Sequence, residues 1–192
     1  MRVFLLAGTQ EARLLASRLI KKNYVVTASL NGNTRNPKNL GCVTRIGGFG
    51  GTQGFRLWLR EFQPDIVIDA THPFASSISA RTKMVCRDMN IPSILFLRDE
   101  WIPKKNDNWC FIDNYEEIKN NIASHSKIFL ATGARSLEKF DNLEGCYIFC
   151  RKIDKTAKKF PLKYGEFIIG RPPFTIQDEL NLFKKLKIDY LV

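Results

Sequence analysis

Residues 2–12 have the sequence RVFLLAGTQEA, in which a short apolar run ends at a glycine and polar residues follow. The apolar run, Arg2 to Ala7, has the length and composition of a buried strand. Residues 11–22 then place apolar side chains at helical spacing. The sequence therefore predicts a strand, a tight turn at Gly8 and a helix.

The same alternation continues along the chain. Further strands are expected at residues 24–30, 43–46, 65–70, 93–97, 127–131, 146–151, 166–170 and 188–192, and further helices at 52–62, 76–89, 115–123, 136–140 and 175–186. Strands joined by crossover helices pair in parallel. We therefore expect an α/β protein with two Rossmann-like lobes and mainly parallel sheets.

The lobes are expected at residues 1–98 and 115–192, with a linker region at 99–114 that has little periodicity. The last residues, 188–192, look like a strand that stops where a ligand-binding loop usually begins. The second lobe is therefore expected to be incomplete, or truncated.

Composition narrows the class of protein. The chain has 192 residues, 44% of them hydrophobic, but no apolar run of about 18 residues that would cross a membrane. Its start lacks the pattern of a signal peptide, so a cytoplasmic protein is expected. Five cysteines scattered among apolar stretches favour reduced core thiols. Cys146 and Cys150 have no second pair at zinc-ligand spacing, so no metal is expected.

The net charge of +11 favours an anionic partner. Nucleic acid, a membrane surface and a small ligand with several negative charges all qualify, and a solvated lysine-rich surface is the simplest alternative. The charge is spread along the chain, and the aromatic residues mostly lie inside apolar strands. A nucleic-acid-binding module would need positive charges and exposed aromatic residues clustered on one face, so nucleic acid is the less favoured partner.

Two turns in the first lobe have the character of a dinucleotide site. Gly8, Thr9 and Gln10 lie between the first strand and first helix, where backbone N–H groups receive phosphate. Ser29 and Arg35 follow the second strand, and no acidic residue lies between them, which favours a 2′-phosphate and hence NADPH. A simple tight turn and a solvated loop remain the alternatives.

Polar side chains also follow the strand at residues 65–70. Asp69, Thr71 and His72 lie at its carboxyl end, and Ser79 lies in the next helix. Ligands of open parallel sheets bind at this edge, and His72 has the pKa range of an acid–base group. A structural role for His72 is equally compatible with the sequence.

Three further segments are candidate ligand contacts. The run Gly47-Gly48-Phe49-Gly50-Gly51 holds regular structure poorly and suits close approach to a ligand, which makes Gly48, Phe49 and Gly50 candidates for binding the cofactor. Arg135 and Arg171 each follow a predicted strand of the second lobe and are suited to gripping a carboxylate. Either arginine is also compatible with an ordinary surface position.

Together these segments resemble the precorrin-6A reductase family of cobalamin biosynthesis along nearly the whole chain. The most specific match is DATHPFA at residues 69–75 with ISA at 78–80. GTQEA at residues 8–12, RIGGFGG at 45–51 and PF at 173–174 with DE at 178–179 accompany it in the same order.

The resemblance implies NADPH bound at the first lobe and hydride delivery to a double bond of an anionic corrin-type macrocycle. His72, Ser79, Arg135 and Arg171 are then our candidates for binding the substrate, with His72 as the catalytic candidate and solvent as the other source of the proton. The implied reaction needs no metal in the protein and no nucleic acid. The excess positive charge then serves to attract the carboxylate arms of the substrate.

The chain departs from the family pattern in three places. Pro172 stands where the family usually has glycine. Asn106 and Asp107 stand where the family usually has a Gly-Asp pair. Members of the family also continue past the last strand with a Lys-Asn-Ser-Gly-Gly-like loop, a helix and a strand. A catalytically inactive relative that still binds the cofactor is therefore the alternative function.

Overall fold

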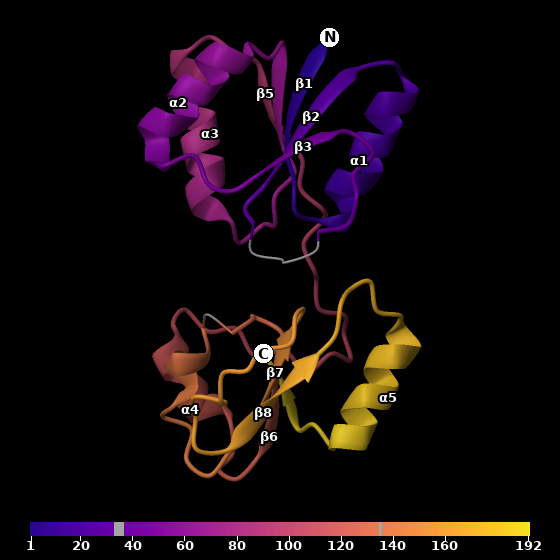
Figure 1. Cartoon of the computed structure of the whole chain (residues 1–192). Coiled ribbons are helices and arrows are strands. Elements are labelled where there is room, and N and C mark those ends of the chain that lie inside the picture. Colours follow the sequence, from indigo (N-terminus) through magenta and orange to yellow (C-terminus); the bar gives the residue numbers. More distant parts are fainter. Residues whose placement is uncertain (33–36, 135) are drawn as a thin grey trace. The chain divides into compact units, whose positions relative to one another are not determined.

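The structure is a computed structural model that describes residues 1–32, 37–134 and 136–192. It divides into two units, Met1–Trp101 and Ile102–Val192, which we call the first and the second unit. Each unit contains one sheet in which all strand pairs are parallel. This confirms the predicted α/β class with two parallel sheets (Figure 1).

The first unit has five strands and three helices among its described residues. They are, in order, β1 (Arg2–Leu6), α1 (Gln10–Lys21), β2 (Val25–Leu30), β3 (Val43–Ile46), α2 (Gly51–Phe62), β4 (Ile66–Asp69), α3 (Ser76–Asp88) and β5 (Ser93–Leu95). The strand order is β3-β2-β1-β4-β5, so the direction of travel across the sheet reverses at β1. The register aligns Leu6 with Ser29 on one side and with Asp69 on the other.

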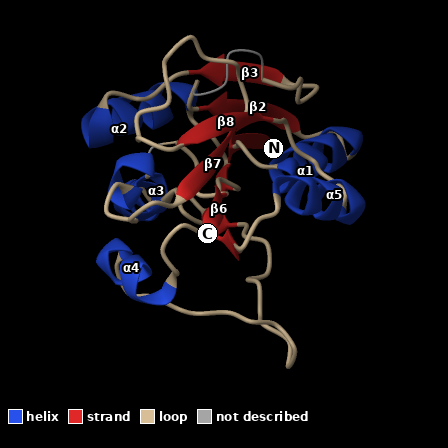
Figure 2. Ribbon diagram, turned by 90° about the horizontal axis from the view of Figure 1, so that it is seen from below, coloured by secondary structure: helices blue, strands red, loops and turns tan. Residues whose placement is uncertain are grey.

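Apolar cores cover both faces of this sheet. α1 lies on one side, while α2 and α3 lie together on the other (Figures 1 and 2). Because strand side chains alternate, Val3 and Leu5 of β1 face the α1 core, whereas Phe4 and Leu6 pack with Phe55 of α2. The apolar residues at the start of the chain thus anchor β1 at the centre of the unit.

The second unit has a smaller sheet with the order β8-β7-β6-β9. Its elements are η1 (Tyr115–Glu117), α4 (Ile118–Asn121), β6 (Lys127–Leu130), η2 (Leu137–Phe140), β7 (Tyr147–Lys152), β8 (Gly165–Ile169), α5 (Ile176–Leu186) and β9 (Tyr190–Leu191), where η denotes a 3-10 helix. α5 begins with a capping box, in which Thr175 and Asp178 bond to each other's backbone N–H groups.

Two helices expected in this unit differ from the prediction. The helix at 115–123 is a 3-10 turn followed by the four residues of α4, and the helix at 136–140 is the 3-10 turn η2. Such short segments are marginal as helices, so packing decides their form. Ile118, Leu137 and Phe140 are buried in one core and hold both segments in place.

The five cysteines are free thiols, and they occupy different environments. Cys86, Cys146 and Cys150 are buried, as expected for core thiols, and Cys42 is half-buried. The expectation is wrong for Cys110, which is exposed because it lies in the segment between β5 and η1 that has neither helix nor strand. In the described ranges of the chain, none of the helices is long and apolar enough to cross a membrane.

Candidate functional site

The turns after β1 and β4 are joined by a threonine. Thr9 precedes α1, and its Oγ1 accepts a hydrogen bond from the N–H of Ala12 at 3.0 Å, which caps the helix. The same hydroxyl donates to the carbonyl of Ala70 at 3.0 Å. Gly8 makes the turn possible, because its φ of 147° is rarely adopted by other residues. Thr9 therefore fixes the two turns against each other where the strand order reverses, the usual ligand position in open α/β sheets.

Asp69 ends β4 as a buried carboxylate, only 3% exposed. Its Oδ1 accepts hydrogen bonds from the backbone N–H of Thr71 at 3.0 Å and from the Thr71 hydroxyl at 2.7 Å. Its Oδ2 is buried as well, but has no hydrogen-bond partner in the described part of the chain. Buried polar atoms are normally paired, so this oxygen is an acceptor suited to a donor on a ligand.

His72 follows in the same turn and is exposed. Its Nδ1 accepts a hydrogen bond from the backbone N–H of Phe74 at 3.2 Å, and the two rings are 5.1 Å apart. Partial burial lowers the pKa of His72, the nearby Arg98 lowers it further, and Glu11 opposes the shift. This arrangement favours the neutral imidazole with its proton on Nε2.

A second group of predicted residues lies at the carboxyl ends of β2 and β3. Ser29 is 5% exposed and lies opposite Arg45 in the sheet. Arg45 donates from Nη1 to Ser29 Oγ at 3.0 Å and to the Gly47 carbonyl at 2.8 Å, and from Nη2 to the Gly48 carbonyl at 3.0 Å. Its guanidinium also lies 4.0 Å from the centre of the Phe49 ring. Sequence reasoning did not select Arg45, although it lies two residues before the glycine-rich loop.

The glycine-rich loop offers open backbone. Gly47, Gly50 and Gly51 have positive φ angles of 115°, 71° and 91°, which favour glycine. A Cβ added at any of them, or at Gly48, would meet no atom within 4 Å. The ring of Phe49, in contrast, packs inward against other aromatic side chains. The loop therefore presents backbone that a ligand can approach, and the Phe49 ring anchors the loop to the core.

The predicted residues of the second unit have a different environment. Arg171 pairs with Asp154 at 3.1 Å, so a carboxylate of the chain itself already faces its guanidinium. Thr132 and Ser136, which flank the other predicted turn, lie 2.8 Å apart at their hydroxyl oxygens. Arg35 and Arg135 lie outside the described residues. Ser79 is half-buried in the first turns of α3, after the turn that carries His72.

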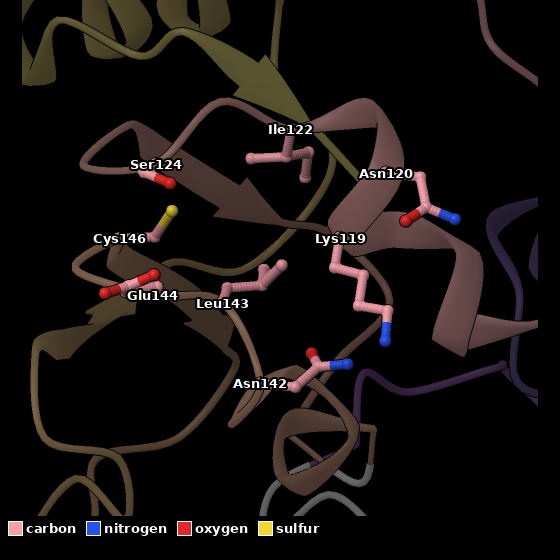
Figure 3. A pocket seen from close by; sticks show the side chains of 8 residues that line it. All are labelled: Lys119, Asn120, Ile122, Ser124, Asn142, Leu143, Glu144 and Cys146. Atoms are coloured by element: carbon pink, nitrogen blue, oxygen red, sulfur yellow. The ribbon is translucent and has the colours of Figure 1, made fainter.

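A separate pocket of about 260 Å³ lies in the second unit, near the residues that precede β6 and β7 (Figure 3). Lys119 and Asn142 extend toward each other across it, and the buried Cys146 also lines it. This is the amino-terminal end of the strands, whereas Arg171 follows the carboxyl end of β8. No residue of the pocket was predicted as a site residue. Across residues 1–32, 37–134 and 136–192, no three His, Cys, Asp or Glu side chains gather as a metal site.

Comparisons with known proteins cover the whole chain. Residues 2–192 match the family described as precorrin-6x reductase CbiJ/CobK. The precorrin-6A reductase of Mycobacterium tuberculosis is 34% identical over 100% of this chain and 77% of its own length. That of Rhodococcus erythropolis is 32% identical with the same coverage. A solved structure described as CobK precorrin-6A reductase matches with a TM-score of 0.92 and 30% identity, over 100% of this chain and 76% of that one.

Proposed function

The chain belongs to the precorrin-6x reductase CbiJ/CobK family, and we propose that it reduces a double bond of a precorrin-6A-type macrocycle with NADPH as hydride source. Membership makes it an oxidoreductase of cobalamin biosynthesis that uses a reduced nicotinamide cofactor. The choice of NADPH and the roles of individual residues belong to the proposal.

One observation carries the proposal beyond the family. The turns after β1 and β4 meet through the Thr9–Ala70 hydrogen bond at the point where the strand order reverses. Dinucleotides bind at this point in doubly wound folds. The residues present also fit such a cofactor, because the open backbone of the glycine-rich loop and the unpaired Oδ2 of Asp69 supply what a polar ligand needs.

We assign the cofactor to the first unit. The backbone of Gly8, Thr9 and Gln10 and the amino-terminal end of α1 would receive its phosphates. Ser29 and Arg35 would bind the adenosine end, beside the loop that contains Gly48, Phe49 and Gly50. Asp69 and Thr71 complete the site at the end of β4. When bound, the cofactor supplies a hydride, and the protein supplies orientation and charge.

We assign the substrate to His72, Ser79, Arg135 and Arg171. The substrate is a macrocycle with several carboxylate arms, and the net charge of +11 attracts it to the protein. His72 is our candidate for the residue next to the reacting bond. Because its Nδ1 accepts the Phe74 N–H, His72 holds its proton at Nε2 and offers it as a hydrogen-bond donor to the substrate.

Calorimetric titration with NADPH and with NADH tests the cofactor assignment. We expect saturable binding with NADPH preferred. An anaerobic reaction with precorrin-6A, followed by absorbance and by the mass gain of two hydrogen atoms, tests the activity. Binding without turnover would identify a cofactor-binding relative without reductase activity. Absence of binding to both nucleotides would contradict the proposed site.

A further inference from the structure

Arg45 is held in one position by groups that carry no negative charge. Its three hydrogen bonds go to a serine hydroxyl and to two backbone carbonyls, and its flat face lies on Phe49. A guanidinium has five N–H donors. Two of them, one on Nε and one on Nη2, therefore have no acceptor in the described part of the chain.

Two other partly buried arginines differ in this respect. Arg56 and Arg151 each lie 2.9 Å from a carboxylate of the chain. Arg45 has no such partner among the described residues, and positions 33–36 and 135 contain no Asp or Glu. Burial lowers the pKa of Arg45, as expected for a cation that is partly removed from water without a compensating anion.

The position of Arg45 relates this charge to the proposed cofactor site. Arg45 pairs with Ser29 in the sheet register, and Ser29 aligns with Leu6, which aligns with Asp69. The four residues form one row across the carboxyl ends of β3, β2, β1 and β4. Arg45 is thus at the end of the row beside β2, where the adenosine ribose lies in dinucleotide-binding folds.

We infer that Arg45 binds the 2′-phosphate of the cofactor and gives the chain its preference for NADPH. This inference rests on the proposed function and deepens it. A fixed cation with two unused N–H groups and no acidic partner has the properties that recognition of a phosphate requires. Ser29 and the carbonyls of Gly47 and Gly48 orient it, so little side-chain entropy remains to be lost when a phosphate binds.

The test is a titration of the whole chain with adenosine 2′,5′-bisphosphate and with adenosine 5′-monophosphate, which differ only in the 2′-phosphate. Wild-type protein is expected to prefer the bisphosphate. Arg45→Gln keeps hydrogen-bonding capacity but removes the charge, so it should lower affinity for the bisphosphate by about tenfold to a hundredfold and leave the monophosphate unchanged. Arg45→Lys should keep part of the preference.

Arg60→Gln is the matched control, because Arg60 is an exposed cation in the last turn of α2. It should leave both affinities unchanged. Equal losses for both nucleotides in Arg45→Gln would show that Arg45 only supports the loop and would overturn the inference. An unchanged preference in Arg45→Gln would do the same. In both cases a wild-type preference for the bisphosphate would leave the proposed function standing.

An NMR measurement on the wild-type protein covers the case in which Arg45→Gln does not fold. The Nε–H resonance of Arg45 is identified as the one that is absent from the NMR spectrum of Arg45→Lys. The bisphosphate should shift this resonance, and the monophosphate should not. No shift with either nucleotide would contradict the inference, and failure of the wild-type chain to bind any nucleotide would overturn both this inference and the proposed function.

Discussion

At His72, the backbone of the turn determines which ring nitrogen carries the proton. Phe74 donates its N–H to Nδ1, and protonation of Nδ1 would replace this hydrogen bond with a repulsive contact. The lowered pKa of His72 agrees with this geometry. The unfolded chain, where the pKa is ordinary, binds this proton more readily. Protonation of His72 therefore lowers the free energy of unfolding as the pH falls through about 6.5. Above that pH, His72 does not change the free energy of unfolding.

This geometry predicts the behaviour of two variants. His72→Ala should lower turnover by about tenfold to a hundredfold, because a donor to a charged substrate group is lost. His72→Gln places an amide N–H near the position of Nε2 and should keep most of the activity. Above about pH 6.5, turnover by the wild type and by His72→Gln should depend on pH in the same way. A wild-type rate that falls with rising pH there, and a flat profile for His72→Gln, would show that the imidazolium supplies the proton.

The cysteines give a prediction that is independent of function. Burial raises the pKa of Cys86 to about 11, and burial also raises the pKa of Cys42 and of Cys150. The thiolate is the reactive form, so iodoacetamide at pH 8 should modify the exposed Cys110 first and Cys86 last. Peptide mass spectrometry measures the order, with the denatured chain as control. Equal rates for Cys86 and Cys110 in the folded protein would contradict the described burial.

The sequence was sufficient to predict that Gly8, Thr9 and Asp69 lie at the carboxyl ends of strands, but not what they contact. Gly8 and Thr9 follow one apolar strand, and Asp69 ends another. Arg45 was missed because its significance depends on Ser29, sixteen positions earlier, which only the sheet register places beside it. A local pattern contains no signal for such a pair. The unpaired Oδ2 of Asp69 is likewise a property of packing and not of sequence.

At the scale of elements, the path of the glycine-rich loop depends on one helical glycine. Gly54 lies in the first turn of α2, and a Cβ at this position would lie 1.6 Å from the carbonyl oxygen of Phe49. Backbone cannot move aside as a side chain can. The loop is therefore able to return closely onto α2 only because residue 54 has no side chain.

Gly54→Ala should lower the free energy of unfolding, because overpacking costs up to about 3 kcal/mol. This exceeds the roughly 1 kcal/mol that alanine gains over glycine in a helix. Gly48→Ala is the control: its Cβ would meet nothing, so the free energy of unfolding should change by less than about 0.5 kcal/mol. Urea unfolding measures both. Equal stability of Gly54→Ala and the wild type would contradict the described path of the loop.

Prediction of elements succeeded for the helices of the first unit and failed for the short helical segments of the second unit. The strand at 43–46 was predicted with its observed bounds, and the helices α2 and α3 within one residue. The helix expected at 115–123 ends early. Asn121 turns its side chain back to the Glu117 carbonyl, and Ile122 is extended. Asparagine side chains compete in this way with the hydrogen bonds of the helix. The spacing of apolar residues does not predict such competition.

At the scale of the whole molecule, residues 92–111 are exposed throughout and join the two units. The segment between β5 and η1 contains Arg98, Lys104 and Lys105, and it has neither helix nor strand. The segment between β7 and β8 also lacks regular structure and carries lysines. It differs because Phe160 and Leu162 pack against the core of the second unit.

Limited trypsin digestion should therefore cut first at Arg98, Lys104 or Lys105, because exposed and unanchored backbone is cleaved most readily. Mass spectrometry of early time points should find two fragments that correspond to the two units. The bonds after Lys158 and Lys159 should remain intact at this stage. First cleavage between β7 and β8 would contradict the prediction and would place the weakest anchoring inside the second unit.

The hydrogen bond from Thr9 to the Ala70 carbonyl has an energetic consequence. The first turn belongs to the proposed cofactor site, and the second leads directly to His72. With the two ligands bound as proposed, order imposed on one turn would be transmitted to the other through this shared hydroxyl. Thermodynamic coupling of this kind is reciprocal, so we expect cofactor and macrocycle to raise each other's affinity by the same factor. Thr9→Val removes this hydrogen bond together with the cap of α1, so it should reduce that factor.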